Sequence, residues 1–223
     1  IRTAVQTIAA RRLGQGLFQE SGVALRNGLL LATIYALPAS IIGVSYSRSF
    51  VPFFIEDAVA TPLTIDYVSI VFIGLLFSSY SFVFQGFYTG IEKTKIHMRV
   101  TIISNLLNVY LNAGLIYGSD GIRTFFLENI PSVSFISFLW QWVDFPEMGV
   151  KGAAIATLIA SVWMTLHYAI SLFSKDLDRV FSIFSTSFDK KMIIRQTKLA
   201  LPQGLQESVI AFGWGFFYKI VGT

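Results

Sequence analysis

Four polar side chains recur along one face of an apolar stretch in the middle of the chain. Residues 100–117 are largely apolar, yet Thr101, Asn105, Asn108 and Asn112 fall within about 60° of one another on a helix. Uncompensated amides in hydrocarbon cost several kcal/mol each, so this Asn stripe cannot face lipid. Either it bonds to a neighbouring helix, or it lines a wet cavity in which Asn108 and Asn112 coordinate a cation or water.

A second candidate site centres on the carboxylate of Glu207. Helical spacing places Gln203, Glu207, Trp214 and Tyr218 on one face of the last apolar segment. A carboxylate inside a membrane span faces a cavity by default and indicates a functional site. Beside aromatic rings it suits an organic cation, and it equally suits Na⁺ or a proton. The alternative is that Glu207 is simply hydrated at the membrane interface.

The sequence lacks the residue combinations that most enzymes use. It has no cysteine, which excludes disulfides, thiolate catalysis and Cys-based metal sites, and its two histidines lie in separate segments. We find no catalytic triad, nucleotide-binding motif or zinc-protease motif. We therefore expect no enzyme and no cofactor, with Na⁺ or H⁺ as a coupling ion and Na⁺ possible at Glu207.

The composition indicates an all-α integral membrane protein, a polytopic helical bundle. Membrane-spanning helices must therefore position these residues. Mean hydropathy is +0.63, and only 13% of the 223 residues are charged, against about a quarter in soluble domains. Segments of about 20 apolar residues are long enough to span a bilayer. They are expected at 28–47, 67–90, 98–118, 148–174 and 200–222, whereas the aromatic patch 134–145 is too short and suits the interface.

The basic residues predict the orientation of the chain. Loops 10–27, 91–99 and 175–198 carry twelve of the seventeen Lys and Arg residues, while the alternate loops are mostly acidic. The positive-inside rule places the basic loops in the cytoplasm, so the basic net charge reflects topology and not binding to nucleic acid. The stretch 175–198, with interleaved Phe and Ile, is predicted to form an amphipathic helix on the membrane surface.

Five segments together resemble the multidrug and toxic compound extrusion (MATE) family of transporters. The segments are VQTIAARRLGQG at 5–16, FQGFYTGIEKTKIHM at 84–98, ISNLLNVYLNAGLIYG at 103–118, FPEMGVKGAAIATLIA at 145–160 and ALPQGLQES at 200–208. The fourth is the most specific. The resemblance implies the N-terminal half of a twelve-helix, two-lobe transporter, from the end of helix 2 to helix 7. Residues 1–174 would form the N-lobe bundle, 175–198 an inter-lobe linker, and 199–223 the start of a C-lobe that is otherwise missing.

Two positions depart from patterns in that family. Some members have a titratable Asp where this chain has Asn112, and others have a Glu where it has Ile210, three residues after Glu207. The resemblance implies a cation-coupled antiporter in the cell membrane that exports amphipathic organic cations by alternating access. The alternatives are a lipid-linked saccharide flippase of the same superfamily, which needs a more cationic cavity, and a non-transporting scaffold, which needs a wholly buried Asn stripe.

Overall fold

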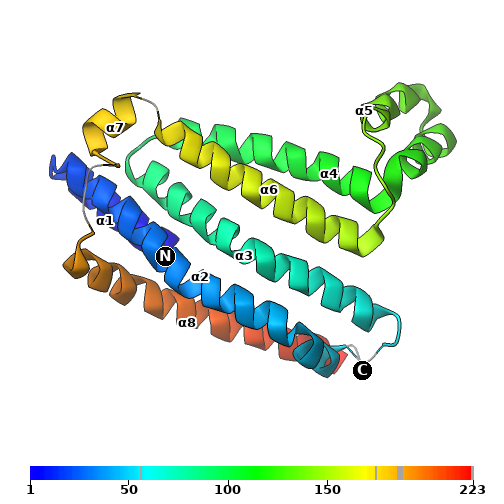
Figure 1. Ribbon diagram of the computed structural model, residues 1–223, viewed down its shortest axis with the longest axis horizontal. Coiled ribbons are helices and arrows are strands. Elements are labelled where there is room, and N and C mark those ends of the chain that lie inside the picture. Colours follow the sequence, from blue (N-terminus) through cyan, green and yellow to red (C-terminus); the bar gives the residue numbers. More distant parts are fainter. Residues whose placement is uncertain (56, 174, 185–187, 222–223) are drawn as a thin grey trace.

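The computed structural model is a bundle of long helices that run along a common axis (Figure 1). It describes residues 1–55, 57–173, 175–184 and 188–221, and the described part contains no strand. The elements are α1 (Arg2–Gly14), α2 (Phe18–Phe54), α3 (Ala60–Gly90), α4 (Thr94–Asn129), η1 (Pro131–Ser137), α5 (Phe138–Gln141), α6 (Gly149–Leu172), α7 (Lys175–Phe181) and α8 (Lys190–Val221).

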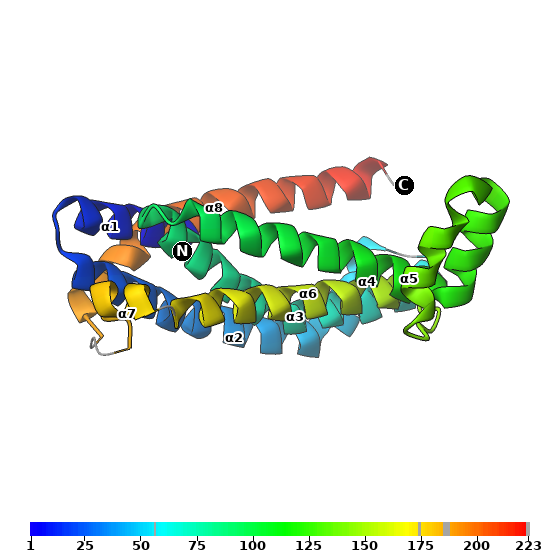
Figure 2. The ribbon, with the colours of Figure 1, turned by 90° about the horizontal axis from the view of Figure 1, so that it is seen from above.

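The helices form two layers. Figure 2 shows α2, α3 and α6 in one layer, with α1, α4 and α8 above it. Four helices, α2, α3, α4 and α6, are long and apolar enough to cross a membrane. The first three contain the predicted spans 28–47, 67–90 and 98–118, and α6 covers 149–172 of the predicted span 148–174. The fifth predicted span lies in α8, which has the length but is not among these four, because Gln203, Gln206, Glu207 and Lys219 lower its hydropathy.

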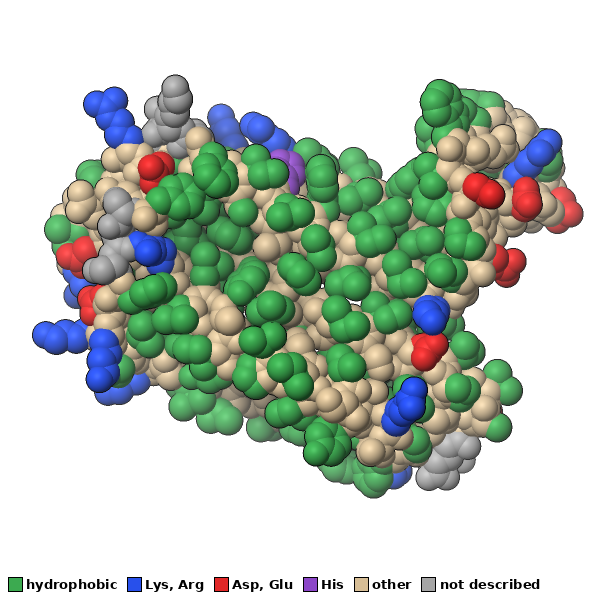
Figure 3. Space-filling view, viewed as in Figure 1, with side chains coloured by type: hydrophobic (Ala, Val, Ile, Leu, Met, Phe, Trp, Pro, Cys, Tyr) green, Lys and Arg blue, Asp and Glu red, His purple; other side chains and the backbone are tan. Residues whose placement is uncertain are grey.

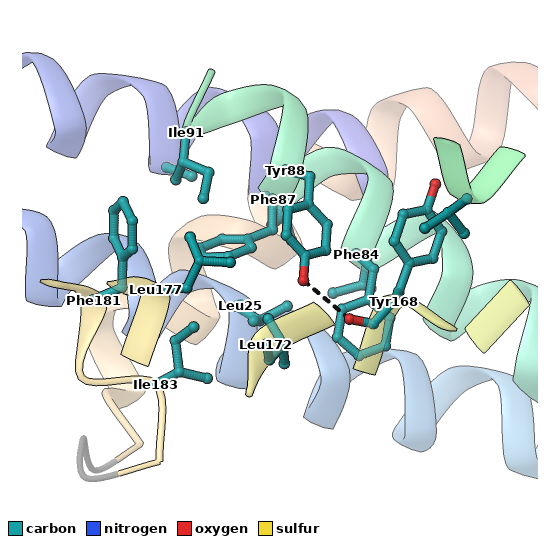
Figure 4. Close-up of a cluster of buried hydrophobic side chains, with 14 of the residues drawn as sticks. Leu25, Phe84, Phe87, Tyr88, Ile91, Tyr168, Leu172, Leu177, Phe181 and Ile183 are labelled. Atoms are coloured by element: carbon teal, nitrogen blue, oxygen red, sulfur yellow. Dashed lines mark hydrogen bonds between the residues drawn. The ribbon is translucent and has the colours of Figure 1, made fainter. Parts of the chain in front are cut away.

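The chain is therefore an all-α, multi-pass membrane protein, as its composition predicts. Its main apolar core lies toward the end where Lys and Arg side chains gather (Figure 3). In that core the rings of Tyr88 and Tyr168 stack at 5.6 Å, and the Tyr88 hydroxyl donates to the Tyr168 carbonyl at 3.0 Å (Figure 4). A tyrosine in hydrocarbon needs such a partner for its hydroxyl, so this bond fixes α3 against α6.

The single amphipathic helix predicted for 175–198 is wrong. The structure has two helices there, and residues 185–187 between them lie outside the described part. Ser182 has a φ of 47°, in the left-handed region, which ends α7. The Asp189 carboxylate then accepts from the backbone N–H of Lys191 at 2.8 Å, which caps a new helix. Leu177 and Phe181 of α7 are buried in the protein core, whereas Val180 is exposed. The role of 175–198 as an inter-lobe linker stays a prediction.

A carboxylate also fixes the start of α3. Asp57 accepts hydrogen bonds from the backbone N–H groups of Val59 at 2.8 Å and Ala60 at 2.6 Å. These bonds favour the charged form, so they hold the pKa of Asp57 below its ordinary value. The residue therefore caps the helix that follows the α2–α3 turn.

Small residues let α6 approach α4 closely. Gly152, Ala156 and Ala160 are all buried on one side of α6, as their four-residue spacing predicts. A Cβ atom added to Gly152 would collide with the backbone carbonyl of Leu115 on α4. Because a backbone atom cannot move aside as a flexible side chain does, this contact sets the separation of the two helices.

We expect Gly152→Ala to destabilise the protein by about 1–3 kcal/mol, the range found for overpacking a close contact. The measurement is the midpoint of thermal unfolding of the full-length protein in detergent. Gly14→Ala is the matched control, because a Cβ atom at Gly14 meets nothing within 4 Å. Equal midpoints for the two variants would show that the α4–α6 separation tolerates a methyl group.

Candidate substrate and cation site

A cavity of about 540 Å³, lined by both polar and apolar groups, lies between α1, α3 and α8. Two of the six residues predicted for the site, Gln203 and Glu207, line it from one face of α8. The opposite walls come from α1 and α3, and the described lining residues there are Ile1, Arg2, Thr3, Gln6, Ser79 and Phe82. Glu207 lines this cavity and is exposed, and its role as a binding site stays a prediction.

Two buried amide side chains determine where α8 begins. Asn27 on α2 is fully buried, and its amide nitrogen donates to the Asp189 carbonyl at 3.0 Å while its oxygen accepts from the Asp189 N–H at 3.4 Å. Gln196 is also fully buried and donates to the Ala24 carbonyl at 2.8 Å. The first two turns of α8 are therefore bonded to α2, and Gln203 and Glu207 project from the helix that continues beyond this contact.

Close glycine contacts position the α1 wall of the cavity. A Cβ atom at Gly86 on α3 would collide with the Arg2 carbonyl, and one at Gly90 would lie 2.8 Å from the Gln6 carbonyl. Gly86 and Gly90 lie four residues apart, a spacing of small residues that predicts close helix packing. The structure confirms that contact and shows its consequence, which is to bring Arg2 and Gln6 to the cavity.

No role for Arg2 is predicted from the sequence, although its charge changes the electrostatics of the site. Its side chain and that of Glu207 line the same cavity, one from α1 and one from α8. No ion pair within 4 Å joins them in the part of the chain that the structure describes. The cavity therefore offers carboxylate and carboxamide oxygens to a cation, and a guanidinium that competes with that cation for Glu207.

The structure does not bring the remaining predicted residues into this cavity. Asn112 donates to the Asn108 side chain at 2.9 Å, and both are partly buried, whereas Asn105 is exposed. The Asn stripe lies on the flank of α4, between the face that packs on α6 and the outward apolar face. Trp214 is 56% exposed, and its ring lies 6.1 Å from that of Tyr218 farther along α8. The roles of these residues stay predictions.

A polar cluster around His97, at the basic end of α4, is not predicted from the sequence. One ring nitrogen of His97 is 2.8 Å from the Gln85 amide nitrogen on α3. The other is 2.6 Å from the Tyr168 hydroxyl on α6 and 3.2 Å from the Thr101 hydroxyl. His97 therefore joins three helices through hydrogen bonds. His97 stands between Lys95 and Arg99 in a basic stretch of the sequence, and its partners on α3 and α6 are 12 and 71 residues away, so no local signal predicts the cluster.

The sequence matches the MatE family model over residues 1–113. It is 30% identical over 184 residues to a probable multidrug resistance protein NorM of Photorhabdus laumondii, covering 81% of this chain and 35% of the relative. A probable NorM of Haemophilus ducreyi is 24% identical over 183 residues, covering 81% of this chain and 34% of the relative. The chain thus spans about a third of the length of these curated relatives.

A solved structure has a similar fold. It is described as the inward-facing conformation of a multidrug resistance MATE family transporter of the MOP superfamily. The TM-score is 0.67 at 21% identity, and the superposition covers 90% of this chain and 40% of that one. At this identity the likeness concerns the fold.

We expect Asn27→Ala to destabilise the protein by about 1–3 kcal/mol, because it removes both hydrogen bonds that the buried Asn27 amide makes with the Asp189 backbone. Thermal unfolding of the full-length protein in detergent measures the effect. Asn129→Ala is the matched control, since Asn129 is exposed and bonds only to the carbonyl one turn earlier in its own helix. An Asn27→Ala midpoint no lower than that of the control would contradict the anchoring role.

Proposed function

The chain belongs to the MatE family, and from that membership we propose that the full-length protein is a cation-coupled antiporter that exports amphipathic organic cations. The relatives named above carry the description of multidrug resistance proteins. The observation that carries the proposal is the cavity that holds Glu207 and Gln203 between α1, α3 and α8. Segments outside this chain would complete its walls, because two fifths of the aligned transporter is covered here.

The cavity has the size and the groups that a small organic cation needs. Ligand pockets commonly measure about 300–1,000 Å³, and this one is about 540 Å³. Glu207 supplies the negative charge, and Phe82 supplies an aromatic ring on the facing wall. A cation with an apolar body gains from both, through Coulomb attraction and cation–π attraction.

In an alternating-access cycle, the coupling ion and the organic cation would bind to Glu207 in turn. In the proposed cycle, Na⁺ or H⁺ moving inward neutralises the carboxylate and displaces the organic cation outward. The two lobes rock about the central cavity between the two steps. Coupling requires the two ligands to prefer opposite states of the protein, because a ligand with equal affinity for both states shifts nothing.

Two observations weigh against the alternatives. A scaffold interpretation needs a wholly buried Asn stripe, but Asn105 is exposed. A flippase of pyrophosphate-linked saccharides needs a cationic cavity, but the single guanidinium of Arg2 is balanced here by Glu207. Cationic cargo is therefore the better match to the groups present.

We also propose that the protein resides in the plasma membrane, or the inner membrane of a bacterium, with its basic end in the cytoplasm. Lys and Arg side chains gather at one end of the bundle, and acidic side chains are more frequent at the other (Figure 3). This distribution is what the positive-inside rule requires of that orientation.

Replacing Glu207 by Gln should lower gradient-driven efflux at least about tenfold, because the amide keeps the shape but cannot exchange one cation for another. Efflux of a fluorescent organic cation from proteoliposomes containing the full-length protein, under a Na⁺ gradient and a pH gradient imposed separately, measures it. Glu128→Gln, at an exposed site remote from the cavity lining, is the matched control.

Unchanged efflux in Glu207→Gln would move the coupling site elsewhere in the protein. Wild-type protein that moves the dye under neither gradient would overturn the antiporter proposal itself. The gradient that drives wild-type efflux identifies the coupling ion.

Replacing Arg2 by Gln should raise the apparent affinity for the organic cation about two- to tenfold, which is up to about 1.4 kcal/mol. The guanidinium no longer competes for Glu207. Binding to purified full-length protein, followed by the polarisation of a fluorescent cation, gives the affinity. Arg123→Gln removes the same charge from an exposed position outside the cavity lining and should leave the affinity unchanged. A weaker affinity in Arg2→Gln would instead show that Arg2 positions the cargo.

A further inference from the structure

Residues 119–147 form an arm that leaves the helix bundle between α4 and α6. The arm begins at Gly118, whose φ of 69° and ψ of 164° break the direction of α4. It contains the last turns of α4, then η1 and α5, and it rejoins the bundle just before α6 begins at Gly149. Neither η1 nor α5 is long enough to enter the membrane as a span.

Hydrogen bonds hold the base of the arm rigidly. The Ser119 hydroxyl shares its one hydrogen between the carbonyls of Trp140 and Val143, at 2.7 and 2.9 Å, and accepts from the Phe145 N–H at 3.0 Å. The Trp140 indole donates to the Tyr110 carbonyl at 2.8 Å, and the two rings stack at 5.4 Å. The orientation of the arm is therefore fixed relative to α4.

The arm exposes many large apolar side chains. Trp142 is 81% exposed and Phe135 is 70% exposed. The other strongly exposed apolar residues of the arm are Phe125, Leu127, Ile130, Phe138, Leu139 and Val143. A surface of this kind, rich in Trp and Phe, is typical of segments that lie in a membrane interface.

The charges of the arm occupy a different edge from its apolar side chains. In Figure 3 the acidic and basic side chains of the arm gather at the edge farthest from the bundle, and hydrophobic side chains cover the edge nearer to it. Because the bundle axis runs along the membrane normal, the charged edge points away from the bilayer. The nearer edge points toward it. This is the arrangement of an amphipathic segment that lies flat on a bilayer.

The depth and direction of the arm support the same conclusion. It branches off where the apolar part of α4 ends and returns where that of α6 begins, so its base lies at the level of the lipid headgroups. Figure 2 shows its helices running across the direction of the spanning helices, that is, in the plane of the membrane. Its apolar surface therefore continues the lipid-facing surface of the bundle.

We propose that the arm lies in the headgroup interface at the end of the bundle opposite the basic loops, with its aromatic side chains toward the acyl chains. The occupant of this surface is lipid. Trp and Phe rings match the boundary between headgroups and hydrocarbon, while the exposed carboxylates Glu128 and Asp120 stay in water. The arm thereby fixes the depth of α4 and α6 in the bilayer.

The test uses single cysteines, because residues 1–223 contain none. Trp142→Cys and Phe135→Cys report on the apolar side of the arm, and Glu128→Cys, at an exposed carboxylate, is the matched control. Each is made in the full-length protein in an otherwise cysteine-free background, spin-labelled and placed in phosphatidylcholine–phosphatidylglycerol nanodiscs. Collision rates of the label with oxygen, which enters lipid, and with a water-soluble nickel chelate give its environment.

We expect oxygen collisions to exceed nickel collisions at 142 and 135, and the reverse order at 128. Nickel collisions exceeding oxygen collisions at all three sites would place the arm in water and overturn the proposal. Immobile labels at 142 and 135 that neither reagent reaches would also overturn it, because the surface would then be covered by protein. Dipolar broadening between labels would identify that protein as a second copy. None of these outcomes depends on transport, so the result stands apart from the proposed function.

Discussion

The contact between the start of α8 and α2 decides where the candidate site can form. Asn27 and Gln196 are fully buried amides that bond to the backbone across this contact. Met192 and Gln196 are the buried residues of α8 among those described, so the rest of the helix takes its direction from this base. Glu207 lies eleven residues beyond Gln196, about 17 Å along a helix. A carboxylate at that height reaches the cavity only because the base is fixed.

Close contacts between backbones position the other helices of the bundle. Gly86 and Gly90 admit α1 against α3, and Gly152 admits α6 against α4. In a membrane the lipid is as apolar as the helix surfaces, so close van der Waals packing and hydrogen bonds between helices replace the hydrophobic effect as the source of association. Interhelical hydrogen bonds of this kind join His97 on α4 to Gln85 on α3 and to Tyr168 on α6.

Charge organises the molecule at two scales. Over the whole bundle, basic side chains mark one end, and the aromatic arm with its charged edge marks the other (Figure 3). Within the cavity, Glu207 and Arg2 place opposite charges on facing walls. The first pattern suits a fixed orientation in a bilayer, and the second suits a site whose occupancy changes with a cationic ligand.

The sequence by itself determined which segments are helices of membrane length and which ridges are small enough for close packing. These properties depend on local composition and on helical period, which are read directly from the order of residues. The prediction of one amphipathic helix over 175–198 is wrong, because the left-handed conformation of Ser182 ends one helix and the cap at Asp189 begins another. Only the tertiary structure decided that Arg2 shares the cavity of Glu207, that His97 bonds to Tyr168, and that the Asn stripe lies on a flank of α4. Each of these depends on which helices become neighbours, and long-range packing fixes that choice.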